Sequence, residues 1–133
     1  MKKTIFLLGL ILILFAACKK DSNDTNDTKT YNVKYEVENK FTQATEFVIR
    51  YTQLSADTTT LDKTLNENEK WDLSFEAKSG DKIYVYVKIE NQSYDFYIAI
   101  YLNGSVEKFD EDAGTYSGSG YLKEESSLGM TLE

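Results

Sequence analysis

The sequence contains no histidine, no proline and a single cysteine, Cys18. Without histidine, no site can use an imidazole, which excludes Ser-His-Asp and Cys-His catalytic groups and His-ligated zinc. One cysteine permits no disulfide within the chain. Basic residues are also scarce, with 15 Lys and Arg against 22 Asp and Glu, and the net charge is −7. Because neutralising phosphates requires clustered cations, a nucleic-acid partner is not expected.

The longest apolar run of the chain lies at its amino terminus. Met1-Lys2-Lys3 precede the apolar residues 5–15, and two alanines follow at positions 16 and 17. A cationic start, an apolar stretch and small residues in this order are typical of a secretory signal peptide. As a helix the run would reach about 16 Å, roughly half of a ~30 Å hydrocarbon core, and is too short to remain as a membrane span. We therefore expect residues 1–17 to be removed as a signal peptide.

Cys18 stands where the signal would be cleaved, and Phe15-Ala16-Ala17-Cys18 resembles the lipobox of bacterial lipoproteins, with Phe in place of the commoner Leu. This resemblance implies that the thiol is diacylated and that the new amino terminus receives a further acyl chain such as palmitate. Several acyl chains give durable attachment, because each buried methylene contributes about 0.8 kcal/mol and one chain alone is marginal. The alternative is a cysteine that ends a cleaved signal by chance. The lipobox predicts a partner in the membrane itself, bound through the acyl chains on Cys18.

Residues 19–29 contain no apolar side chain and are rich in Lys, Asp and Asn. Such a segment cannot offset the entropy of ordering and is expected to be a flexible linker that holds the domain roughly 18 Å from its anchor. A Lys- and Asp-rich stretch after an acylated cysteine also resembles the surface-export signals of Bacteroidota lipoproteins. The expected location is the cell envelope, with a lipid anchor in the outer membrane and either the periplasmic or the external side left open. The segment 18–29 is thus the acylated cysteine and linker, and residues 30–133 form the folded domain.

From Thr30 onward, apolar and polar residues alternate with a period of two, which is typical of half-buried strands. Three turn signals separate these strands: Ser79-Gly80-Asp81, Asn91-Gln92-Ser93, and Asn103-Gly104, which predicts a two-residue hairpin into Ser105–Phe109. Further strands are expected over 115–123 and 128–132. The alternating segments are Tyr31–Val37, Phe47–Tyr51, Trp71–Ala77, Ile83–Ile89 and Phe96–Leu102. The pattern predicts an all-β, antiparallel, immunoglobulin-like β-sandwich of seven or eight strands with Trp71 in its core.

The order of these segments resembles the small MmpS-type β-sandwich domain, which is known from mycobacterial membrane proteins and from many short Bacteroidota lipoproteins. The resemblance is carried by Tyr31–Val37, Val48–Thr52, Leu65–Phe75 and Ile98–Gly104, and it covers most of the domain. The two cysteines of the mycobacterial members have no counterpart here. The resemblance implies the fold and an envelope location. Mycobacterial members accompany lipid exporters, and a transport role carries over only weakly.

Four tyrosines are expected to point outward from what we take to be a central hairpin. Tyr84 and Tyr86 alternate against Ile83, Val85 and Val87, and Tyr97 and Tyr101 alternate against Phe96, Ile98 and Ile100. Together they would form a flat aromatic platform for a sugar chain, a peptide or a protein surface. The alternative is that the rings only cover the sheet, because tyrosine favours strands and pairs across them.

Three other features carry weaker signals. Arg50, the one arginine, would clamp a carboxylate or stack on a tyrosine, or else form a surface ion pair. Asp57-Thr58-Thr59 in a predicted polar loop resembles a short O-glycosylation signal of Bacteroidota envelope proteins, and marks Thr58. The acidic groups at 110–112 and 124–125 are expected to be solvated turns, because two acids must converge on one cleft to act in catalysis.

Two functions follow from these observations. The first is a membrane-anchored envelope lipoprotein whose domain is a non-enzymatic interaction or accessory module, with another envelope protein or a glycan as partner. The second is a glycan- or peptide-binding module for nutrient capture that uses the tyrosine platform. No catalytic residue, metal site or cofactor is expected, because the sequence offers no tuned acid-base pair and no phosphate or zinc motif.

Overall fold

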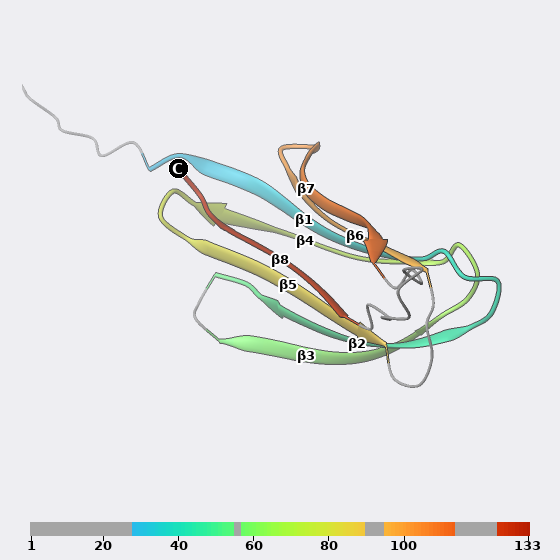
Figure 1. Cartoon of the computed structure of the whole chain (residues 1–133). Coiled ribbons are helices and arrows are strands. Elements are labelled where there is room, and N and C mark those ends of the chain that lie inside the picture. The colour runs from blue at the N-terminus through green and yellow to red at the C-terminus, as the bar shows by residue number, and fades with distance from the viewer. Residues whose placement is uncertain (1–27, 55–56, 90–94, 114–124) are drawn as a thin grey trace, which may run out of the picture.

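The computed structural model describes residues 28–54, 57–89, 95–113 and 125–133, and within them the chain forms eight β-strands and no helix. The strands build two four-stranded antiparallel sheets (Figure 1). Sheet A has the order β4-β1-β6-β7, and sheet B has the order β3-β2-β5-β8. The strands are β1 (Thr30–Asn39), β2 (Thr45–Thr52), β3 (Thr58–Leu65), β4 (Lys70–Lys78), β5 (Lys82–Ile89), β6 (Phe96–Leu102), β7 (Ser105–Ala113) and β8 (Glu125–Thr131). The predicted antiparallel β-sandwich is therefore confirmed.

The chain stays within one sheet at only two of its connections, β2–β3 and β6–β7, and crosses between the sheets at the others. One predicted strand pairing is therefore wrong. The segments 83–89 and 96–102, which we took for the two arms of a hairpin, are β5 in sheet B and β6 in sheet A. The turn expected at Asn91-Gln92-Ser93 lies outside the described residues.

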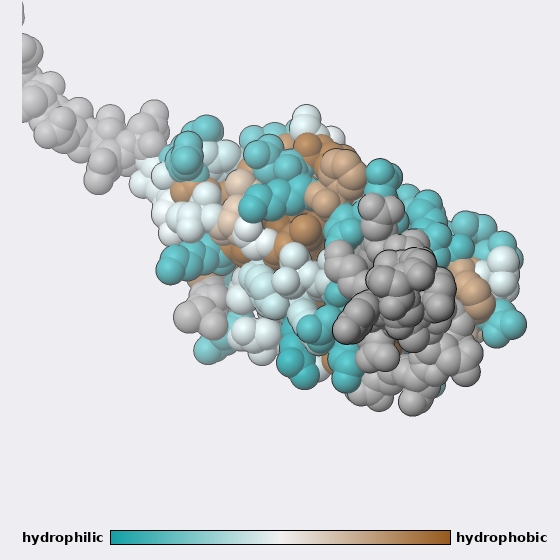
Figure 2. Space-filling model, in the orientation of Figure 1, coloured by the Kyte–Doolittle hydropathy of each residue, from teal (hydrophilic) through white to brown (hydrophobic). Residues whose placement is uncertain are grey.

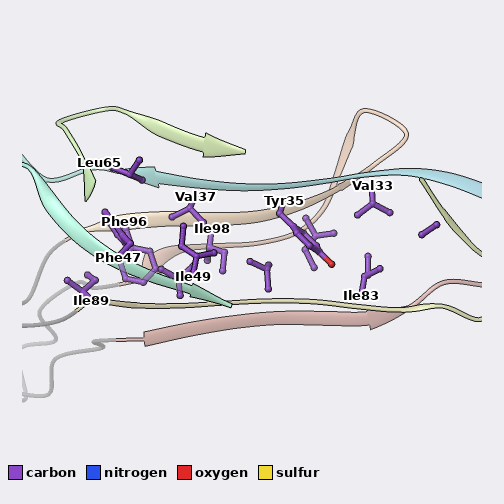
Figure 3. Packing of buried hydrophobic residues seen from close by; sticks show 14 of the residues in the cluster. Val33, Tyr35, Val37, Phe47, Ile49, Leu65, Ile83, Ile89, Phe96 and Ile98 are labelled. Carbon is purple, nitrogen blue, oxygen red and sulfur yellow. The ribbon is translucent and has the colours of Figure 1, made fainter. Parts of the chain in front are cut away.

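The core lies between the sheets and is built from the inward-facing residues that the alternation predicted (Figure 3). β1 and β6 contribute from one side and β2 and β5 from the other. Since these strands are central in their sheets, their inward side chains are covered from every direction. The largest buried side chains include Tyr35, Phe47, Ile49, Phe96, Ile98 and Ile100.

Trp71, predicted in the core, packs against its margin and is not fully buried. It lies on β4, an edge strand of sheet A, and is only partly buried, with its ring 5.5 Å from that of Tyr51. An edge strand has a neighbour on one side only, so its inward residues keep some contact with solvent. Leu73 and Phe75 of the same strand are partly buried for the same reason.

The segment 58–65 was missed by the sequence analysis, which assigned Asp57-Thr58-Thr59 to a loop. It forms β3, the edge of sheet B, and only Leu65 in it is buried. A threonine-rich edge strand that is exposed over most of its length shows no apolar alternation, yet threonine itself favours strands.

The predicted hairpin at Asn103-Gly104 is present. Both residues have positive φ, +51° and +85°, and Leu102 pairs with Ser105 across the turn. β7 then continues to Ala113, four residues beyond the predicted end, and the strand expected over 128–132 begins earlier, at Glu125. The strand expected over 115–123 lies outside the described residues. No helix in the described ranges is long and apolar enough to cross a membrane.

Candidate functional site

The four tyrosines of the expected platform lie on two different sheets. Tyr84 and Tyr86 are on β5 in sheet B, and Tyr97 and Tyr101 are on β6 in sheet A. Because each pair points away from the core, the pairs occupy opposite outer faces of the sandwich. The single four-tyrosine platform is therefore wrong, and each pair must be considered with its own neighbours.

On sheet B, both tyrosines are engaged within the molecule. The hydroxyl of Tyr86 donates to Oε2 of Glu125 at 2.6 Å, and the Arg50 guanidinium lies 5.3 Å from the centre of the Tyr86 ring. Burial and the hydrogen bond to Glu125 raise the pKa of Tyr86 to about 12. The ring of Tyr84 lies over Gly129, where a Cβ would come within 3.2 Å of Cδ2. Of the alternatives for Arg50, stacking on a tyrosine is thus the one observed.

Sheet A carries an unusual feature, two glutamates that face outward and are nevertheless buried. Glu36 and Glu38 lie on β1 and are 6% and 8% exposed. β1 is flanked by β4 and β6, and the register places Lys70 and Tyr97 beside Glu38 and places Asp72 and Ala99 beside Glu36. The side chains of Lys34, Lys70 and Tyr101 contact the Glu36 carboxylate and help to shield it from water.

Three lysines pair with these two carboxylates. Lys34 Nζ lies 2.7 Å from Oε2 of Glu36, and Lys70 Nζ lies 3.1 Å from Oε1 of Glu36 and 3.2 Å from Oε2 of Glu38. Lys40 Nζ lies 2.8 Å from Oε1 of Glu38. We call the five residues Lys34, Glu36, Glu38, Lys40 and Lys70 the Glu36 cluster.

The electrostatics of the cluster are set by these pairs. Burial alone would raise the pKa of Glu36, but the hydrogen bonds and charges of Lys34 and Lys70 outweigh it, so the pKa lies below its ordinary value. The hydrogen bonds to Glu36 and Glu38 in turn raise the pKa of Lys70. Both partners therefore remain charged around neutral pH, and the pairs hold their side chains in place.

Two tyrosines extend the cluster across β6. Tyr101 donates a hydrogen bond to Oε1 of Glu36 at 3.3 Å, and Lys34 Nζ lies 4.0 Å from the centre of the Tyr101 ring. Burial and a side-chain hydrogen bond between Tyr97 and Tyr101 raise the pKa of Tyr97 to about 12. The hydroxyls of Tyr97 and Tyr101 thus continue the polar network that begins at Glu36.

Beyond the tyrosines, β7 presents two exposed apolar side chains, Phe109 at 54% and Val106 at 46%. The Phe109 ring lies 6.3 Å from that of Tyr97, with 31° between their planes. Ala99, which pairs with Phe109, is fully buried although it faces outward. A small residue at this position lets the larger side chains around it close over the sheet.

A depression of about 550 Å³ opens on the same face beside the cluster. Its lining includes Lys34 and Tyr101, which it shares with the polar network. The remaining polar lining comes from Asn32, Ser74 and Glu76, and Val33, Phe75 and Gly104 complete the lining. The outer face of sheet A therefore combines a depression, fixed hydrogen-bonding groups and exposed aromatic rings, and it is the candidate site.

The other sequence-predicted residues lie away from this face. Thr58 is exposed at the start of β3. Asp110 accepts a hydrogen bond from Ser126 at 2.6 Å and Glu125 accepts the one from Tyr86, so both acids hold strands rather than line a cleft. Among the described residues, no group of three His, Cys, Asp or Glu is placed to hold a metal ion. Cys18 lies outside the described residues.

Glu36, Glu38 and Phe109 are not predicted as site residues from the sequence. The two glutamates alternate with valines and tyrosines on β1 and look like ordinary solvent-facing residues. Only the sheet order, which puts β1 between β4 and β6, makes them buried. In comparisons with known proteins, no protein-family model matches the chain and no match is found among curated proteins.

Proposed function

We propose that the protein is an envelope lipoprotein, anchored in the outer membrane by acyl chains on Cys18, whose β-sandwich is a non-enzymatic interaction module. The observation that carries the proposal is the position of the single cysteine, directly after an apolar run of signal-peptide length and two alanines. The resemblance of β1, β2, β4 and β6 to the MmpS-type domain supports the same location.

The geometry of the sandwich fits a tether at one end. The twelve residues 18–29 separate the expected signal peptide from the start of β1 at Thr30, and Thr30 pairs with Lys78 at the same end where Lys82 pairs with Thr131. Tyr31 donates a hydrogen bond to the carbonyl of Glu133, so both ends of the described domain meet there (Figure 1). An anchor at this end does not require either outer face to contact the bilayer.

The outer face of sheet A is the surface on which we place the partner. Its Glu36 cluster is held by charge pairs, and Phe109 and Val106 are exposed beside it. Exposed apolar side chains next to a fixed polar network are typical of recognition surfaces.

Fractionation and peptide mass analysis test the anchor. We expect the mature chain in the outer-membrane fraction, with an amino-terminal peptide that begins at an acylated Cys18. The matched control, Cys18→Ser, should accumulate with residues 1–17 still attached. A mature chain in the soluble fraction with an unmodified Cys18 peptide would contradict the proposal.

Photocrosslinking in cells tests the interaction. A photoreactive amino acid at position 109 should crosslink to an envelope component, while the same group at position 60, on the exposed edge strand β3, serves as the control. Equal crosslinking from both positions would contradict the proposal that the partner binds the outer face of sheet A.

A further inference from the structure

We propose that the outer face of sheet A binds a neutral oligosaccharide. This inference rests on the proposed function and names the ligand of its interaction surface. It differs from the tyrosine platform expected from the sequence, because Tyr84 and Tyr86 take no part and the residues of β1, β4 and β7 do.

The depression beside the Glu36 cluster has the size and lining for one or two sugar units. Its volume of about 550 Å³ falls within the range of roughly 300–1,000 Å³ typical of small-molecule sites. Its polar side chains, from Asn32, Lys34, Ser74 and Glu76, include both donors and acceptors. A sugar, which carries a hydroxyl on nearly every ring carbon, matches such a lining.

The aromatic rings provide the second element of a saccharide site. Tyr101 belongs to the wall of the depression, and Tyr97 and Phe109 lie beyond it on the same face. The planes of Tyr97 and Phe109 differ by only 31°, and more than half of Phe109 is exposed. The C–H faces of pyranose rings pack well on such surfaces, because burial of apolar area and the negative face of the ring both favour the contact. A chain of several sugar units would run from the depression over these rings.

The charge balance of the face selects a neutral ligand. Each lysine of the Glu36 cluster is paired with a carboxylate at 3.2 Å or less. An anionic ligand would have to compete with these internal partners, and a cationic ligand would meet the same lysines. The ammonium groups of Lys34 and Lys70 have three N–H donors each, so donors remain for hydroxyl groups. These donors are already held in place, which lowers the entropy cost of binding.

Figure 2 shows apolar surface, in brown, between polar areas of the molecule. The exposure of apolar side chains is therefore not enough by itself to identify the binding site. The tyrosines of sheet B supply the matched comparison. Tyr86 is occupied by Glu125 and Arg50, and Tyr84 covers Gly129. They are aromatic, outward-facing and on the same domain, but the Glu36 cluster lies on the other sheet and is not beside them.

The test uses the full acylated protein in lipid nanodiscs, titrated calorimetrically with cellohexaose, xylohexaose, laminarihexaose and mannohexaose, and with a galacturonate hexamer as the charged comparison. We expect at least one neutral hexasaccharide to bind in the micromolar to millimolar range and better than the galacturonate. Phe109→Ala and Tyr97→Ala should each weaken binding about five- to tenfold, by loss of stacking. Tyr84→Ala and Tyr86→Ala should leave it within about twofold, because those rings face the other side.

Each other outcome overturns the inference. Absence of binding by all four neutral sugars, equal losses in the sheet B variants, or tighter binding of galacturonate would do so. Capture of a protein partner that is lost in Phe109→Ala, without sugar binding, would replace the saccharide with a protein and leave the proposed function standing. Loss of acylation would instead be a failure of the proposed function. Near-ultraviolet circular dichroism from Trp71 establishes that each variant is folded.

Discussion

The phenol of Tyr35 crosses the sandwich and donates a hydrogen bond to the backbone carbonyl of Thr52 at 2.8 Å. Tyr35 lies on β1 in sheet A, and Thr52 ends β2 in sheet B. The same oxygen accepts a hydrogen bond from the backbone N–H of Tyr84 on β5 at 3.1 Å. The pairing of β2 with β5 stops at Tyr51 and Val85, one residue before these two groups. The hydroxyl therefore satisfies a donor and an acceptor that the diverging strands leave apart.

Removing this hydroxyl should destabilise the fold. Tyr35→Phe keeps the ring and its edge contact with Phe75 at 5.2 Å, but leaves the Thr52 carbonyl and the Tyr84 N–H without their partner. We expect a loss of about 1–3 kcal/mol in the free energy of unfolding, measured by urea denaturation. Tyr84→Phe, at a half-exposed ring, is the control and should change stability by less than about 0.5 kcal/mol. Equal effects would mean that the Tyr35 bridge does not hold the sheets together.

The Glu36 cluster predicts how the free energy of unfolding depends on pH in the acid range. Since Lys34 and Lys70 hold the pKa of Glu36 below its ordinary value of 4.5, the folded state binds the proton less tightly than the unfolded chain. The stabilising contribution is complete above pH 4.5 and is lost as the pH falls through the folded-state pKa. Glu36→Gln should therefore reduce stability at neutral pH and flatten its decline in acid. Glu76→Gln, at an exposed position of β4, should keep the wild-type decline; a decline that is also unchanged in Glu36→Gln would refute the assignment.

Three phenols should titrate late in alkali: Tyr35, whose burial raises its pKa, and the outward-facing Tyr86 and Tyr97. Burial, with the hydrogen bonds described above, raises the pKa values of Tyr86 and Tyr97 to about 12, so both stay protonated in the folded state at pH 11. Phenolate absorbance should show this late step, and Tyr86→Phe should remove one phenol from it. Glu125→Gln should move Tyr86 back towards 10, because the acceptor carboxylate is gone. Titration of all phenols near pH 10, with circular dichroism still that of the folded protein, would contradict the geometry.

Thr58 is the predicted O-glycosylation site, and its surroundings in the structure differ from those expected. It was expected in a loop and instead begins an exposed edge strand, where its side chain is open to solvent. If the Asp57-Thr58-Thr59 signal is used, the intact mass in the native host should exceed the acylated chain by a glycan, and Thr58→Ala should remove that mass while Thr60→Ala does not. A wild-type mass explained by the acyl groups alone would end this hypothesis.

The sequence allowed the two-layered fold to be predicted, but not the order in which the strands pair within each sheet. Alternation in β1, β2, β5 and β6 reports which side chains face the core, and the structure agrees. The same alternation is produced whether β5 and β6 pair with one another or face one another across the core, so the hairpin error could not be detected. β3 escaped prediction because its threonines favour a strand without an apolar alternation, and Leu65 is its only buried residue.

The candidate site depends on pairings that are distant in sequence. Glu36 becomes buried because Lys70 and Tyr101, 34 and 65 positions away, reach it from both neighbouring strands. Phe109 joins the site because it pairs with Ala99 across the β6–β7 hairpin. The Asn103-Gly104 turn allowed that hairpin to be predicted, but the position of β1 beside β6 could not be. The sheet order was therefore the missing information.

The central claim, a lipid anchor on one sulfur, is tested most directly by growing cells with labelled palmitate and isolating the protein and its Cys18→Ser variant. We expect label in the wild-type chain and none in the variant. Equal labelling of the two proteins, or no label in either, would contradict the account.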